Sequence, residues 1–137
     1  MSPVFCCIAN RKRFAFYNQI DYNEHMNTIA ETKNFSQQAA KFLTENEYNA
    51  LKTFLAWHPE AGVIVRGTGG VRKLRWNRPG MGKSGGVRVI YYFHNETIPL
   101  LLIDLYAKNE KENLSKEERN LLAKIVDVYI NTYGRKL

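Results

Sequence analysis

Cysteine is nearly absent from this chain: the two cysteines, Cys6 and Cys7, are adjacent, and a bridge between neighbours is strained. Two cysteines cannot form the disulfide framework of a small secreted domain, and their scarcity fits a reducing cytosol. Long apolar runs are also missing. The run Ile98–Ile103 is interrupted by Pro99 and falls far short of the roughly 18 apolar residues that a membrane span requires. These absences exclude a disulfide scaffold and a membrane-spanning protein, and we expect a cytoplasmic one.

Clustered metal ligands and nucleophiles are lacking as well. The histidines His25, His58 and His94 have no metal-ligand spacing, and no cysteine joins them. No Ser-His-Asp constellation is evident. The glycine-rich stretch 80–85 matches G-x-G-x-x-G, but it opens a predicted strand rather than a helix. We therefore interpret this stretch as a hairpin loop and expect neither a metal nor another cofactor.

Acidic residues are outnumbered by basic ones. The chain has 137 residues, the size of one domain, with 20 Lys and Arg against 13 Asp and Glu and a net charge of +7. Hydrophobic residues make up 45% of the chain, so a core can form without disulfides or metals. A basic balance of this kind favours a polyanionic partner, such as nucleic acid, a ribosome, an acidic membrane face or an acidic protein.

Residues 1–25 lack both the layout of a signal peptide and the periodicity of a helix or strand. Their apolar stretch, Val4–Ala9, precedes the charges at Arg11–Arg13 instead of following them. We expect this segment to be an extension ahead of a true start at Met26. The alternative is a real N-terminal strand or arm, and mass spectrometry of the native protein distinguishes the two. Residues 26–137 are predicted to form a single domain.

Apolar residues at helical spacing predict three helices in this domain. The first covers about Asn34–Leu43, the second is opened by Thr44 and ended by His58-Pro59, and the third is opened by Ser115 and ends before Gly134. Thr44 and Ser115 each precede a glutamate by three residues, which is the pattern of a capping box.

Strand patterns lie before and between these helices. A short strand is expected at Asn27–Glu31, and segments rich in β-branched and aromatic residues follow at Val63–Val65, Val71–Trp76, Val87–His94 and Ile98–Tyr106. We predict the order β-α-α-β-β-β-α. This order indicates an α+β fold of two layers, with a small, mostly antiparallel sheet and helices packed on one face.

Basic residues concentrate on the predicted sheet. Residues 61–95 include seven basic residues and no acidic one, which creates a positive field there. A solvated basic loop is the simpler interpretation, but the charges lie on strands as well as loops. Lys73 and Arg75 are two residues apart and leave one face of their strand, Arg88 begins the next strand, and Lys108 follows the last. We expect these four side chains to converge.

Convergent cations without acids suit a phosphate, because arginine presents a planar fork of donors and lysine a point charge. Like-charged neighbours penalise a protonated lysine, which helps such a lysine take a proton from a ribose 2′-hydroxyl. Arginines beside it would stabilise the charge of the pentavalent phosphorane. The chemistry predicted is metal-independent RNA cleavage, in which the 2′-oxygen attacks the adjacent phosphate. The same patch is also compatible with binding alone.

Three runs of the chain, Gly67–Trp76, Arg78–Phe93 and Leu101–Ser115, resemble the RelE/HigB group of bacterial toxin–antitoxin toxins, most closely its HigB-like branch. The resemblance extends from about Asn27 to the C-terminus and implies the compact RelE fold. It implies a cytoplasmic endoribonuclease, an mRNA interferase, that enters the ribosomal A site of the 70S ribosome, cuts mRNA and inhibits translation. The partner implied is a cognate antitoxin, often a small helix-turn-helix protein, with operator DNA contacted only through it and no membrane involved.

Matching motif positions assign the catalytic roles to Lys73, Arg75, Arg88 and Lys108. RelE has a lysine at the position of Arg75, and an arginine stays protonated, so Arg75 cannot be the base. We assign that role to Lys73, with Lys83 or Lys108 as reserves. The other basic residues of this region are predicted to bind RNA or the ribosome: Arg66, Arg72, Arg78, Lys83 and Lys111.

Two further positions depart from the RelE pattern. Asn109 stands where RelE has a second basic residue, and the tyrosine that RelE carries a few residues later has no match in Asn113–Ser115. Two alternatives therefore remain beside the ribonuclease: a non-nucleolytic DNA gyrase poison resembling ParE, and a basic nucleic-acid-binding module without catalysis. The convergent cations favour the ribonuclease, because a gyrase poison needs no convergent phosphate site.

Overall fold

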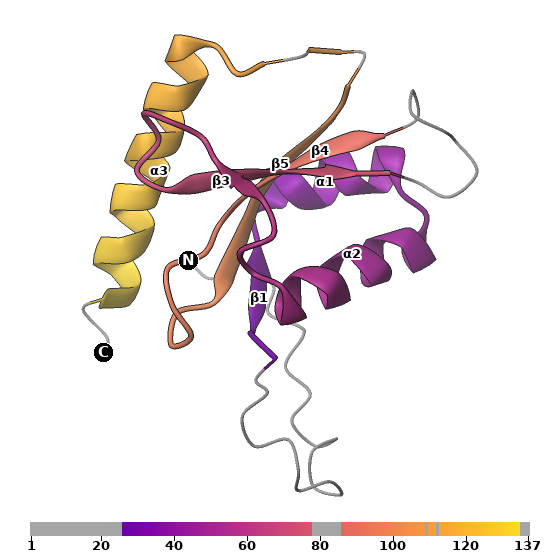
Figure 1. The fold of residues 1–137 in the computed structure, drawn as a ribbon, viewed down its shortest axis with the longest axis horizontal. Helices are drawn as coiled ribbons and strands as arrows, with labels where there is room; N and C mark the ends of the chain where they lie inside the picture. Colours follow the sequence, from indigo (N-terminus) through magenta and orange to yellow (C-terminus); the bar gives the residue numbers. More distant parts are fainter. Residues whose placement is uncertain (1–25, 78–85, 109, 112, 135–137) are drawn as a thin grey trace, which may run out of the picture.

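The computed structural model describes residues 26–77, 86–108, 110–111 and 113–134. The predicted extension 1–25, the glycine-rich stretch 80–85 and the candidate residues Arg78 and Lys83 lie outside these ranges. Eight elements follow one another along the described chain (Figure 1): β1 (Ile29–Glu31), α1 (Lys33–Phe42), α2 (Glu45–Trp57), β2 (Val63–Ile64), β3 (Val71–Trp76), β4 (Val87–Tyr92), β5 (Leu100–Ala107) and α3 (Lys116–Gly134).

Side-chain caps begin all three helices. Thr32 accepts a hydrogen bond from the Phe35 amide at the start of α1. The two predicted capping boxes are confirmed: Thr44 opens α2, and Ser115 with Glu118 opens α3 through reciprocal bonds of 2.8 and 3.1 Å. Among the residues described, no helix is both long and apolar enough to cross a membrane.

The sheet has five strands in the order β1-β5-β4-β3-β2. Strands β3, β4 and β5 form the predicted antiparallel meander, and β1 pairs with β5 in parallel, with Ile29 opposite Leu100. The predicted order has three strands after the helices and the structure has four. The additional strand is β2, which has two residues and lies within the strand pattern expected at Val63–Val65. In the structure Val63 pairs with Lys73, so β2 forms the edge beside β3.

Both faces of the sheet are covered, which corrects the prediction that the helices pack on one face. Val89 and Tyr91 of β4 join one buried cluster with side chains of α1 and α2. Ile90 and Tyr92, which alternate with them, join a second cluster with Leu122, Val126 and Tyr129 of α3. Figure 1 shows α3 set apart from α1 and α2. The reason is the strands themselves: β4 and β5 are apolar on both faces, and each face needs a cover. The α+β class is confirmed.

Candidate functional site

Strands β3 and β4 supply three cations to one face of the sheet. Arg75 lies directly opposite Arg88 in the β3–β4 ladder. Lys73 precedes Arg75 by two residues, and side chains two apart on a strand leave the same face. The alternating residues Leu74 and Trp76 pack against the core on the other face, as the sequence predicts. The cations therefore stand on the face that α3 covers further along.

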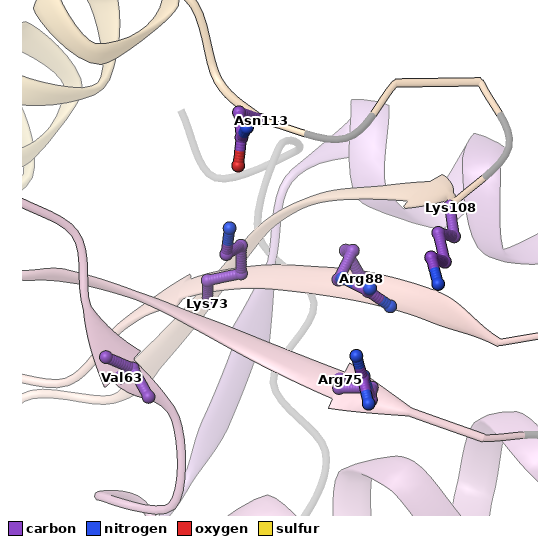
Figure 2. A pocket seen from close by; sticks show the side chains of 6 residues that line it. All are labelled: Val63, Lys73, Arg75, Arg88, Lys108 and Asn113. Atoms are coloured by element: carbon purple, nitrogen blue, oxygen red, sulfur yellow. The ribbon is translucent and has the colours of Figure 1, made fainter. Parts of the chain in front are cut away.

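Lys108 reaches the same region from the end of β5. Arg88 is opposite Tyr106 in the β4–β5 ladder, and Lys108 follows Tyr106 by two residues. The Lys108 amide donates to the carbonyl oxygen of Gly86 at 3.4 Å, which holds the chain against the start of β4 as it leaves the sheet. In Figure 2 the side chains of Arg75, Arg88 and Lys108 gather at one end of the site, and Lys73 stands at the other, toward Asn113.

These side chains line an open hollow with a volume of about 540 Å³ (Figure 2). All four predicted catalytic residues belong to it, and two residues that the sequence analysis did not select complete it. They are Val63, from the edge strand β2, and Asn113, from the segment that precedes α3. Val63 is signalled only by its pairing with Lys73, and Asn113 only by its place before the Ser115 cap. The pairing of Val63 appears only when the strands are placed together, and the predicted Ser115 cap does not by itself bring Asn113 to the hollow.

The hollow is electropositive. Two ion pairs occur within the described part of the chain, Lys52 with Glu31 and Lys111 with Glu118. Neither includes Lys73, Arg75, Arg88 or Lys108, so no described carboxylate neutralises the four cations. A concave surface with this charge attracts a phosphate, and the two arginines provide donors matched to its oxygens.

Tyr106 is buried next to the hollow, in a row across the sheet with Arg88 and Arg75. The Lys111 ammonium lies 4.6 Å from the centroid of the Tyr106 ring. Burial raises the pKa of the Tyr106 hydroxyl, an effect opposed by the charge of Arg88 and reinforced by Asp104 and Glu118. The phenol is therefore neutral near neutral pH.

Comparison with known protein families identifies the family of this chain. A family model described as the RelE toxin of the RelE / RelB toxin-antitoxin system matches residues 60–137, more than half of the chain. The chain belongs to the RelE toxin family. The matched segment runs from just before β2 to the end of the chain and so contains every residue that lines the hollow. This RelE-family chain is thus a toxin of a toxin–antitoxin system, in a family whose members are commonly ribonucleases that inhibit translation.

The other predicted RNA-binding residues of this RelE-family toxin are dispersed. Arg66 is exposed in the turn between β2 and β3. The Arg72 guanidinium donates to the carbonyl oxygens of Gly62 (2.7 Å) and Glu60 (3.3 Å), on the face opposite the hollow. Alternation along β3 makes this unavoidable, because Arg72 adjoins Lys73. Lys111 is bound to Glu118 at 2.5 Å. Arg72 therefore clamps the segment that leads into β2 and does not join the hollow.

Proposed function

We propose that this RelE-family toxin is a ribosome-dependent mRNA endoribonuclease of the HigB-like branch. The observation that carries the proposal is the convergence of Lys73, Arg75, Arg88 and Lys108 on one hollow without a described carboxylate among them. Cleavage by way of the 2′-hydroxyl needs a base, a proton donor and compensation for the charge that develops on the phosphate. Two lysines and two arginines are able to supply all three.

The reaction is a displacement at phosphorus. Lys73 takes the proton of the 2′-hydroxyl, and the 2′-oxygen forms a bond to the adjacent phosphorus. The bond from phosphorus to the 5′-oxygen breaks, leaving a 2′,3′-cyclic phosphate, and Lys108 donates a proton to the departing 5′-oxygen. Arg75 and Arg88 stabilise the phosphorane charge. Lys73 and Lys108 stand at opposite ends of the hollow (Figure 2), which suits an in-line arrangement of attacking and leaving oxygens.

The partners follow from this activity. The substrate is mRNA in the A site of the 70S ribosome, where the message is single-stranded and its phosphates are accessible to the hollow. A cognate antitoxin, a small helix-turn-helix protein, holds the activity off and alone contacts operator DNA. The toxin then works in the cytoplasm, where translation takes place.

The test is cleavage of a defined mRNA by the purified toxin, with and without 70S ribosomes. Ribosomes need magnesium, so chelation by EDTA is applied only to free RNA. We expect cuts only in ribosome-bound message. Lys73→Ala should lower the cleavage rate by about 10²–10⁴-fold, the usual contribution of a general base, while ribosome binding is kept. Lys41→Ala, which removes an exposed lysine from α1, is the matched control and should leave the rate unchanged.

The cleavage assay also distinguishes the ribonuclease from the alternative functions. No cuts in either arm would reject the nuclease and direct the work to gyrase supercoiling and to plain nucleic-acid binding. An equal loss of ribosome binding and cleavage in Lys73→Ala would reject Lys73 as the base, and the same experiment on Lys108 would follow.

A further inference from the structure

The hydroxyl group of Tyr106 has no hydrogen-bond partner among the residues that the structure describes. It is completely shielded from solvent, and the residue is only 3% exposed. A buried phenol normally finds a partner, because an unsatisfied hydroxyl costs free energy. The packing of Tyr106 into the sheet uses its ring, so a phenylalanine would serve the fold as well. The hydroxyl therefore needs an explanation other than stability.

Arg88 is the neighbour best placed to use this hydroxyl. The two residues are directly opposite in the β4–β5 ladder and leave the same face, and side chains in such pairs have Cβ atoms about 4.5–5.5 Å apart. The guanidinium is close enough for its charge to act on the phenol. Arg88 also lines the hollow, whereas Tyr106 is not one of its lining residues. A guanidinium has five N–H donors, so it can hold two phosphate oxygens and still donate to a third partner.

We propose that Tyr106 is a positioning residue for Arg88: when an RNA phosphate occupies the hollow, the phenolic oxygen accepts an N–H from Arg88 and fixes the guanidinium on the phosphate. This inference rests on the proposed ribonuclease function. The hydrogen bond orients the cation during the displacement, so it contributes to the rate of cleavage more than to binding.

Direct contact between Tyr106 and RNA is disfavoured by what covers the ring. The Lys111 ammonium lies over it, and Glu118 holds that ammonium through an ion pair of 2.5 Å. RNA that approached the ring from this side would have to displace both partners, whereas Arg88 stands directly opposite Tyr106 on the same face of the sheet. The neutral phenol adds no negative charge that would compete with the phosphate for the guanidinium.

The deciding experiment is a double-mutant cycle on single-turnover cleavage of ribosome-bound mRNA. Tyr106→Phe should lower the rate about 10- to 100-fold, the value of one hydrogen bond to a charged group, with ribosome binding unchanged. In the Arg88→Ala background the same substitution should change the rate less than about twofold, because the residue it acts through is gone. Tyr92→Phe is the matched control: its hydroxyl bonds His94 at 3.0 Å, outside the hollow, and the rate should not change.

Two further measurements, the melting temperature and NMR, distinguish a failure of this proposal from a failure of the proposed ribonuclease function. An equal loss of cleavage rate in both backgrounds would overturn the proposal, because Tyr106 would then touch the RNA itself. A lowered melting temperature of Tyr106→Phe would overturn it too, because the hydroxyl would then stabilise the fold. NMR of the Arg88 Nε–H group with a 2′-O-methyl oligonucleotide, which cannot be cleaved, needs no catalysis. Ordering of this group in the wild type but not in Tyr106→Phe supports positioning even if the wild type fails to cleave, and equal ordering in both rejects it.

Discussion

At the scale of single residues, the hydroxyl of Tyr91 contrasts with that of Tyr106. It accepts a buried hydrogen bond from the Gly62 amide and donates a partly buried one to the Pro59 carbonyl oxygen, both at 2.8 Å. Tyr91→Phe should lower the free energy of unfolding by about 1–3 kcal/mol, because a buried amide and carbonyl lose their partner. Urea denaturation measures the change. Tyr106→Phe is the control, because its hydroxyl makes no hydrogen bond to a described residue that the substitution would break. Equal stabilities of the two variants would contradict this account.

Glu31 makes a residue-level prediction about pH. Burial raises its pKa above the ordinary value of 4.5, against the opposing charge of Lys52, whose ammonium is 3.7 Å away. The folded protein then binds this proton more tightly than the unfolded chain, so stability is lost as the pH rises from 4.5 through the raised pKa. Glu31→Gln should flatten this fall in urea denaturations across that range, and Glu96→Gln, at an exposed site, should not. An unchanged pH slope in Glu31→Gln would refute the assignment.

At the scale of elements, α3 depends on its first turn. The Ser115 hydroxyl accepts from the Glu118 amide, and the Glu118 carboxylate accepts from the Ser115 amide and pairs with Lys111. Ser115→Ala should lower the free energy of unfolding by about 0.5–2 kcal/mol, the usual cost of a lost cap. Thr53→Ala, at an exposed position inside α2, should cause no loss in the same thermal or urea denaturation. A Ser115→Ala variant as stable as the wild type would show that the cap is dispensable.

The helix caps, the meander and the shared face of Lys73 and Arg75 could all be predicted from the sequence, because each depends on residues close together in the chain. The parallel pairing of Ile29 with Leu100 depends on positions about 70 residues apart, and no local pattern encodes it. The position of α3 on the second face also depends on the assembled sheet. Arg72 shows a different limit: charge alone made it a candidate, although alternation along β3 already assigned it to the other face.

At the scale of the whole molecule, we expect the net charge of +7 to act on RNA mainly through the hollow. Each phosphate contact to a single strand contributes a slope of about −0.7 to the dependence of log K on log salt. Arg75→Ala should therefore make the slope shallower by about 0.7 in titrations of a 2′-O-methyl oligonucleotide across salt concentrations. Lys41→Ala removes the same charge from α1, and should leave the slope unchanged. Equal changes in both variants would mean that RNA responds to overall charge and not to the hollow.

The strand order has a consequence for how the toxin is made. β5 lies between β1 and β4, yet it is the last strand to be synthesised. The described part of β1 has no other strand to pair with, so it must wait for Leu100 and its neighbours to leave the ribosome. Contacts of such long sequence separation form late in folding. Because Lys108 follows β5 directly, a nascent chain in which β5 is not yet in place carries Lys73, Arg75 and Arg88 without a complete hollow.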